Sequence, residues 1–262
     1  MFLWRNYTPQ FKDIPCISYI FGWCAIAGFY ILVMFPFWFM AKENAGLCTF
    51  DPDAPCSTCG NKGEIFCKPD ENKVIVSHLL EGSFIIMAVL GTGLTSLLLG
   101  SLWPVLVFSI FSALFFLVIQ PRITCSHCPY YAEDRLFLHC TENHFSPKIW
   151  RYHPEPIARW EKTGTTVGFA FLGAFPLFVE LYGMVVFWQS SPGLVPFLGA
   201  VGVFVGTMLT LALFYVVFFL LYCPHCVNFS CQFNKVPKPT VDRYLNANPV
   251  LKEAWEKSGY KF

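Results

Sequence analysis

The residues of this chain with the greatest capacity for chemistry are its cysteines. Three pairs have a CxxC spacing, and each pair is followed by one more cysteine: Cys56, Cys59 and Cys67; Cys125, Cys128 and Cys140; Cys223, Cys226 and Cys231. A tight turn between paired cysteines lets both thiolates point at one ion, and structural zinc sites add further Cys or His ligands. The spacing therefore predicts metal binding, with zinc favoured over an iron–sulfur cluster.

The three segments differ in how well they can supply four ligands. The first contains an additional cysteine, Cys48, and can form a site of four thiolates by itself. The second offers His139, His144 or His153 as a fourth donor, and our expected ligand set includes His144. The third has only His225, which lies inside the CxxC turn and is badly placed to join the same tetrahedron. Its site therefore needs an outside ligand, as in a zinc site completed across segments or an iron–sulfur cluster, although no ferredoxin spacing is present.

Thiol–disulfide exchange is the competing chemistry. The tetrapeptide Cys223-Pro-His-Cys226 resembles the active-site tetrapeptide of periplasmic thiol oxidases. The resemblance covers four residues and implies a redox-active pair, but the βαβ context of those enzymes is missing because an apolar span comes immediately before. Since CxxC disulfides are usually redox-active, a membrane thiol–disulfide oxidoreductase is the alternative hypothesis. Whether the chain is an enzyme stays open.

The cysteines belong to a strongly apolar chain. Hydrophobic residues make up 55% and charged residues only 13%, against about 25% charged in soluble domains. A membrane-crossing helix takes about 20 apolar residues. Five segments qualify: Ile17–Met40, Ser77–Leu99, Leu102–Ile119, Thr165–Trp188 and Leu194–Tyr222. The first is too long for the apolar part of a cleavable signal peptide. We therefore expect an all-α integral membrane protein with five transmembrane helices in a lipid bilayer.

Threading these five spans places all three cysteine-bearing segments on one side of the membrane. Gly100-Ser101 and residues 189–193 form tight turns on the other side. The cysteine side carries sixteen of the eighteen Lys and Arg residues, so the positive-inside rule makes it cytoplasmic. Ten of the twelve cysteines then share one aqueous layer, on which we expect a protein partner to dock. No basic stripe indicates nucleic-acid binding.

A sequence repeat relates the second and third cysteine segments. After CxHC, each copy continues with C-x-x-N, P-x-x-x-R-Y, P and W-E-K-[T/S]-G in the same order. Each copy follows a predicted transmembrane hairpin, and parallel repeats of this kind are related by an axis along the membrane normal. The expected domains are the tail and first helix, a cysteine-rich loop, repeat 1 and repeat 2: residues 1–40, 41–76, 77–164 and 165–262.

Three polar residues in the spans are candidates for intramembrane function. Glu180 lies within the fourth span, where a carboxylate costs about 2–3 kcal/mol, so it should face the bundle interior or a partner. A proton relay, a quinone contact and a hydrogen-bonded structural role are all compatible with this position. His78 and Glu81 lie one helical turn apart near the cysteine side. They form either a metal-binding or proton-shuttling pair or a hydrated interfacial pair.

Together these features predict an integral membrane subunit whose cysteine modules bind zinc or an iron–sulfur cluster. Such a subunit would serve as a scaffold or an electron-transfer accessory of a membrane-associated complex. A second alternative besides the oxidoreductase is a transporter, suggested by the parallel repeats and Glu180, although the broken helices that usually build a substrate site are lacking.

Overall fold

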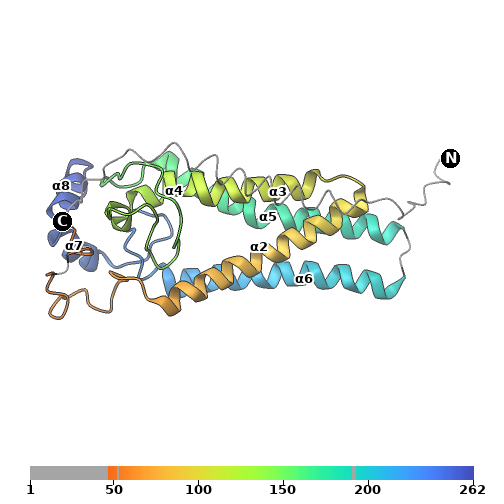
Figure 1. Ribbon diagram of the computed structural model, residues 1–262, viewed down its shortest axis with the longest axis horizontal. Helices are drawn as coiled ribbons and strands as arrows, with labels where there is room; N and C mark the ends of the chain where they lie inside the picture. Colours follow the sequence, from red (N-terminus) through yellow and green to blue (C-terminus); the bar gives the residue numbers. More distant parts are fainter. Residues whose placement is uncertain (1–46, 52, 191–192) are drawn as a thin grey trace. The chain divides into compact units, whose positions relative to one another are not determined.

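The computed structural model describes residues 47–51, 53–190 and 193–262. The predicted first span, Ile17–Met40, lies outside these residues. The described chain is helical and contains no strand; one isolated antiparallel bridge pairs Phe137 with Pro147. In Figure 1 the long helices run side by side, and the cysteine-bearing segments gather at one end of them.

Four helical stretches are long and apolar enough to cross a membrane: Glu71–Leu99, Trp103–His127, Arg159–Gln189 and Leu194–Tyr222. They correspond to four of the five predicted spans. The first and third begin earlier than predicted, because hydropathy detects only the apolar part of a helix and omits its polar first turns. At the first of these starts, the Asp70 side chain accepts a hydrogen bond from the backbone N–H of Lys73 (3.2 Å), which caps the helix.

The first and third spans are single helices, α2 (Glu71–Leu99) and α5 (Arg159–Gln189). The second span consists of α3 (Trp103–Leu114), the π-helix η1 (Phe115–Ile119) and α4 (Gln120–Ile123). The fourth consists of α6 (Leu194–Val217) and the π-helix η4 (Phe218–Tyr222). Both π-helices begin with the sequence Phe-Phe-Leu, and each lies shortly before a CxHC turn. The sequence repeat therefore extends back into the transmembrane helices. Single π-helical turns are rare and frequently occur at functional sites.

Close helix contacts in the bundle depend on small residues. Helix α2 packs on α3, α5 and α6, and α5 also packs on α3 and α6. Gly183 of α5 lies so near α2 that a Cβ atom there would be 2.4 Å from Oγ1 of Thr95. In α6, Gly206 lies against Met87, whereas a Cβ on Gly202 would meet nothing within 4 Å. Of these two glycines, spaced four residues apart, only Gly206 therefore contributes to close packing.

The three cysteine-bearing segments pack on one another at the end of this bundle. The second segment contains the short 3-10 helices η2 (Cys125–His127) and η3 (Pro129–Ala132), and the C-terminal segment ends in α7 (Lys238–Asn246) and α8 (Pro249–Lys257). One apolar cluster takes buried residues from all three segments, among them Leu47, Tyr131, Leu138, Leu245 and Leu251. The segments therefore form a single folded layer, which we call the cysteine layer (residues 47–70, 124–158 and 223–262).

Replacing Gly183 with alanine should destabilise the bundle by about 1–3 kcal/mol, the usual cost of overpacking, because the buried Thr95 side chain has no room to move away. The matched variant Gly202→Ala places its methyl group in open space and should be neutral or slightly stabilising. Thermal unfolding of both purified variants in detergent measures the difference. Equal melting temperatures would show that α2 and α5 do not approach this closely.

Candidate metal centre in the cysteine layer

A cavity of about 130 Å³ lies where the membrane helices meet the cysteine layer. Six cysteines line it, three from each repeat copy: Cys125, Cys128, Cys140, Cys223, Cys226 and Cys231. Phenylalanine rings from the membrane helices form much of the remaining wall, and Glu81 and Glu142 add carboxylates. The cavity therefore brings two of the three predicted cysteine groups to one place.

The first-loop cysteines form a separate group on the outer part of the layer. Cys48 and Cys67 are half-buried, whereas Cys56 and Cys59 are exposed. Burial, together with negative charge on Cys48, Cys59 and Cys56, raises the pKa of the Cys67 thiol to about 12. None of these four cysteines lines the cavity. A four-thiolate site in the first loop stays a prediction.

In the second segment, Asn143 holds two sulfurs in place. Its backbone N–H donates to Sγ of Cys140 (3.0 Å), and its side-chain amide donates to Sγ of Cys125 (3.1 Å). The expected fourth ligand, His144, does not line the cavity; its Nδ1 lies 3.2 Å from the carbonyl oxygen of Cys140. The other histidine candidates are also directed elsewhere, with His139 beside Glu133. This segment therefore supplies three thiols to the cavity and no histidine, and its Glu142 carboxylate also lines the cavity.

In the third segment, the CxHC histidine is directed away from the sulfurs. His225 stacks on Phe66 (ring centroids 5.1 Å apart), and its Nδ1 lies 3.0 Å from the carbonyl oxygen of Leu221. Asn234 folds the turn by donating from its side-chain amide to the carbonyl oxygen of Cys226 (2.7 Å). The missing fourth ligand of this segment is therefore not its own histidine.

The cavity thiols are buried or half-buried, and none of them forms a disulfide. Burial raises the thiol pKa of Cys140 and Cys223 to about 12 and that of Cys231 to about 11, and it raises those of Cys128 and Cys226 further. The ten cysteines of the described residues are all free of disulfide bonds. Reactive redox cysteines have lowered pKa values, so these buried thiols are poor nucleophiles. A bound cation would hold them as thiolates.

The sulfurs are not arranged around a common point. Among the described residues, no group of three or more His, Cys, Asp or Glu side chains is placed so that it could hold a metal ion. A cysteine side chain has three staggered rotamers, and each rotation swings the sulfur within the cavity. Metal binding therefore requires the lining thiols to rotate toward one another, whereas the backbone already brings them to the same cavity.

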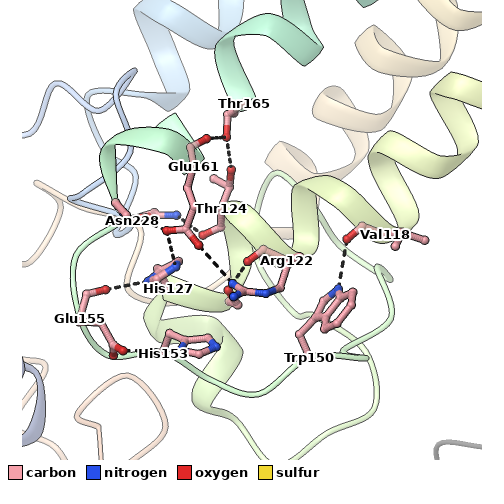
Figure 2. Close-up of polar contacts among 12 residues, drawn as sticks. Val118, Arg122, Thr124, His127, Trp150, His153, Glu155, Glu161, Thr165 and Asn228 are labelled. Atoms are coloured by element: carbon pink, nitrogen blue, oxygen red, sulfur yellow. Dashed lines mark hydrogen bonds and ion pairs between the residues drawn. The ribbon is translucent and has the colours of Figure 1, made fainter. Parts of the chain in front are cut away.

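A buried glutamate that the sequence did not single out fixes the CxHC turn of the second segment, Cys125–Cys128. Figure 2 shows Glu161, at the start of α5, between Arg122 and His127. Arg122 Nη1 donates to Glu161 Oε1 (3.2 Å), and His127 Nε2 lies 3.2 Å from Glu161 Oε2. His127 Nδ1 faces the carbonyl oxygen of Glu155 (2.7 Å), which requires a proton on Nδ1. The CxHC histidine therefore positions the turn and is no ligand.

The same contacts continue into the third segment. Thr124 and Thr165 share a hydrogen bond between their hydroxyl groups (2.9 Å), and the side-chain amide of Asn228 donates to the carbonyl oxygen of Thr124 (2.9 Å). All three residues are buried. Helix α5 and the two CxHC segments are thereby tied together beside the cavity (Figure 2).

The third segment also binds the first loop. Asn248, which is fully buried, accepts a hydrogen bond from the backbone N–H of Cys48 (2.8 Å) and donates to Sγ of Cys48 (3.3 Å). Tyr244 exchanges a hydrogen bond with Thr49 (2.6 Å), and the Arg243 guanidinium binds Asn61 (2.9 Å) and Glu64. The repeated Arg-Tyr pair thus joins two cysteine segments in its second copy.

The intramembrane candidates occupy different surroundings. Glu180 is buried between helices, as the sequence predicted; its Oε1 accepts a hydrogen bond from Thr207 of α6 (3.0 Å), and it fills the space over Gly91 of α2. Glu81 lines the cavity, whereas His78 contacts the carbonyl oxygens of Val74 (2.8 Å) and His144 (3.3 Å). The predicted His78–Glu81 pair therefore contributes one cavity residue.

Compared with known proteins, the chain matches no family model, no curated protein and no solved structure. Its function has to be inferred from the chemistry of the cysteine layer. Sequence reasoning missed Glu142 and Glu161 because acidic residues in a polar loop usually belong to its solvated surface. The repeated C-x-x-N element was the available signal for the sulfur contacts of Asn143.

Replacing Glu161 with glutamine should destabilise the cysteine layer by on the order of 3 kcal/mol, because it leaves Arg122 and His127 without their carboxylate. The repeat-equivalent variant Glu256→Gln is the control, since Glu256 is exposed. Limited proteolysis of the polar segments in detergent, with the cleavage rate compared between the variants, measures the effect. Equal cleavage rates would contradict a structural role for the Glu161 contacts.

Proposed function

We propose that this chain is an integral membrane subunit that binds metal ions through its cysteine layer and serves a membrane-associated complex as a scaffold or electron-transfer accessory. The observation that carries the proposal is the cavity lined by six cysteines, three of them buried and three half-buried, at the end of the membrane helices. Thiols are rarely gathered in this number without either a disulfide or a metal, and those in the described residues are free of disulfides.

The surroundings of the sulfurs support metal thiolates over reactive thiols. Burial makes the ionised form costly unless a cation and hydrogen-bond donors compensate. Donors are present in the N–H groups of Asn143 at Cys140 and Cys125, and in the Asn248 amide at Cys48. Groups that donate to metal-bound ligands orient them and tune the metal. Zinc is the favoured ion, and an iron–sulfur cluster is the version that would carry electrons.

The cysteine layer is also the part of the chain best suited to a protein partner. It projects beyond the membrane-spanning helices, and its Lys and Arg content favours the cytoplasmic side. Exposed side chains on it include Phe145 and Leu136. A scaffold would dock its partner here with zinc fixing the fold, and an electron carrier would pass charge across the same surface.

One observation favours the thiol–disulfide alternative for part of the molecule. Cys56 and Cys59 are exposed, unlike the cavity cysteines, and redox-active CxxC pairs need access to their partners. This alternative places the cysteine layer on the extracytoplasmic side and makes the first loop, not the cavity, the reactive part.

Metal analysis of the full chain, purified anaerobically in detergent, tests the proposal. We expect bound zinc or iron, and a chelator that removes it should lower the melting temperature because a metal that binds only the folded state stabilises it. Iron with visible absorbance would support electron transfer, and colourless zinc would support the scaffold.

The control variant Cys16→Ser/Cys24→Ser should keep its full metal content, since the sequence places these two cysteines at and within the first apolar span. A metal-free wild-type protein whose Cys56 and Cys59 oxidise and reduce reversibly would contradict metal binding and favour the oxidoreductase.

A further inference from the structure

The second and third cysteine groups face the same cavity. Each group supplies three sulfurs and lacks a histidine ligand, since His144 and His225 are both directed at backbone carbonyl groups, and the second segment adds the Glu142 carboxylate to the lining. A tetrahedral zinc site needs four ligands. Two incomplete groups that meet in one space can complete each other.

Contacts between the two segments hold them together beside the cavity. The side-chain amide of Asn228, from the third segment, donates to the carbonyl oxygen of Thr124 in the second (2.9 Å), and both residues are buried and line the cavity. Within the second segment, Asn143 donates to the sulfurs of both Cys140 and Cys125 (3.0 and 3.1 Å). The thiols of the two segments still have to rotate toward one another to share an ion.

We propose that these six cysteines form one centre for two divalent thiolate-binding ions of the zinc class, with two of the thiolates bridging the pair. Two tetrahedral ions need eight metal–ligand bonds, and six thiolates supply eight when two of them bind both ions. The inference rests on the proposed metal-binding function and deepens it, because it makes the repeat the origin of a shared site.

The cavity suits this centre in size and charge. Its volume of about 130 Å³ is the space of roughly four liquid waters at about 30 Å³ each, which is ample for two ions. Six thiolates and two divalent ions leave a net charge of minus two. Lys235 and Lys162 lie near Cys223 and Cys231 respectively, and their positive charge offsets part of that excess, to which the Glu142 carboxylate adds when it is ionised.

The first-loop cysteines belong to another site and have to be removed from the count. In the full chain carrying Cys56→Ser and Cys59→Ser, which alter exposed residues, we expect two zinc ions per chain after zinc loading and desalting. Adding Cys140→Ser from one segment, or Cys226→Ser from the other, should in each case lower the zinc content from two to fewer than one, since each ion takes ligands from both segments.

Two independent sites would give a different result. Each added variant would then lose one zinc ion and keep the other, and the double variant would lose both. That additive pattern, or a single zinc ion per chain in the starting protein, would overturn the shared centre while leaving metal binding intact. Absence of both zinc and iron from the anaerobically purified wild type, together with no zinc uptake by the starting protein, would overturn the proposed function as well.

Cobalt provides a measurement that needs no change in the cavity. In the Cys56→Ser/Cys59→Ser protein loaded with cobalt(II), bridging thiolates should couple the two ions magnetically, so the electron paramagnetic resonance intensity per cobalt falls as the second ion binds. An intensity per cobalt that stays constant from low loading to saturation would overturn the bridge, even if the cavity variants fail to fold.

Discussion

Burial of thiols at the end of a membrane helix bundle is the constraint on which the cysteine layer depends. A sulfur removed from water can be charged only if a cation and hydrogen-bond donors replace the solvent. The chain supplies the donors through asparagine side chains, Asn143 at Cys125 and Asn248 at Cys48. These amides are held in place because the apolar residues around them, such as Tyr244 and Leu245, are fully buried.

The ends of the membrane helices pack against the cysteine layer and lead directly into its segments. Both hairpins end in a π-helix and then a CxHC turn, so the two copies deliver their first cysteines to the same end of the bundle. Helix α5 contributes Glu161 from its first turn, which connects the CxHC turn at Cys125–Cys128 to the membrane-spanning part of the chain. Small residues such as Gly183 and Gly168 let these helices approach closely enough to converge on one cavity.

Features that depend on local sequence were predictable. Four of the apolar spans follow from the length of their apolar runs. The turn after α2 and the end of α8 follow from glycines that adopt positive φ, Gly100 and Gly259. The start of α8 at Pro249 was equally readable from Asn248-Pro249. The side chain of Asn248, however, does not cap the helix as its position suggests, because it is bonded to Cys48 and to the carbonyl oxygen of Tyr244.

Features that depend on which segments meet were not predictable. The repeat makes Glu161 and Glu256 equivalent in sequence, yet the first is buried beside Arg122 and the second is exposed. Helix α5 runs on into the membrane and meets the preceding CxHC turn, whereas α8 ends in solvent near the C-terminus. Sequence spacing gave the second group a histidine ligand and left the third group without a fourth ligand, whereas the fold places both groups around one cavity.

The central claim is that separate stretches of the chain supply sulfur ligands to the same metal ions. X-ray absorption spectroscopy at the zinc or iron edge of the purified full-length protein measures this directly. The account predicts a first shell of about four sulfur atoms per metal at about 2.3 Å. A first shell made of nitrogen and oxygen at about 2.0–2.2 Å would contradict it, since the metal would then be bound elsewhere than at the cysteines.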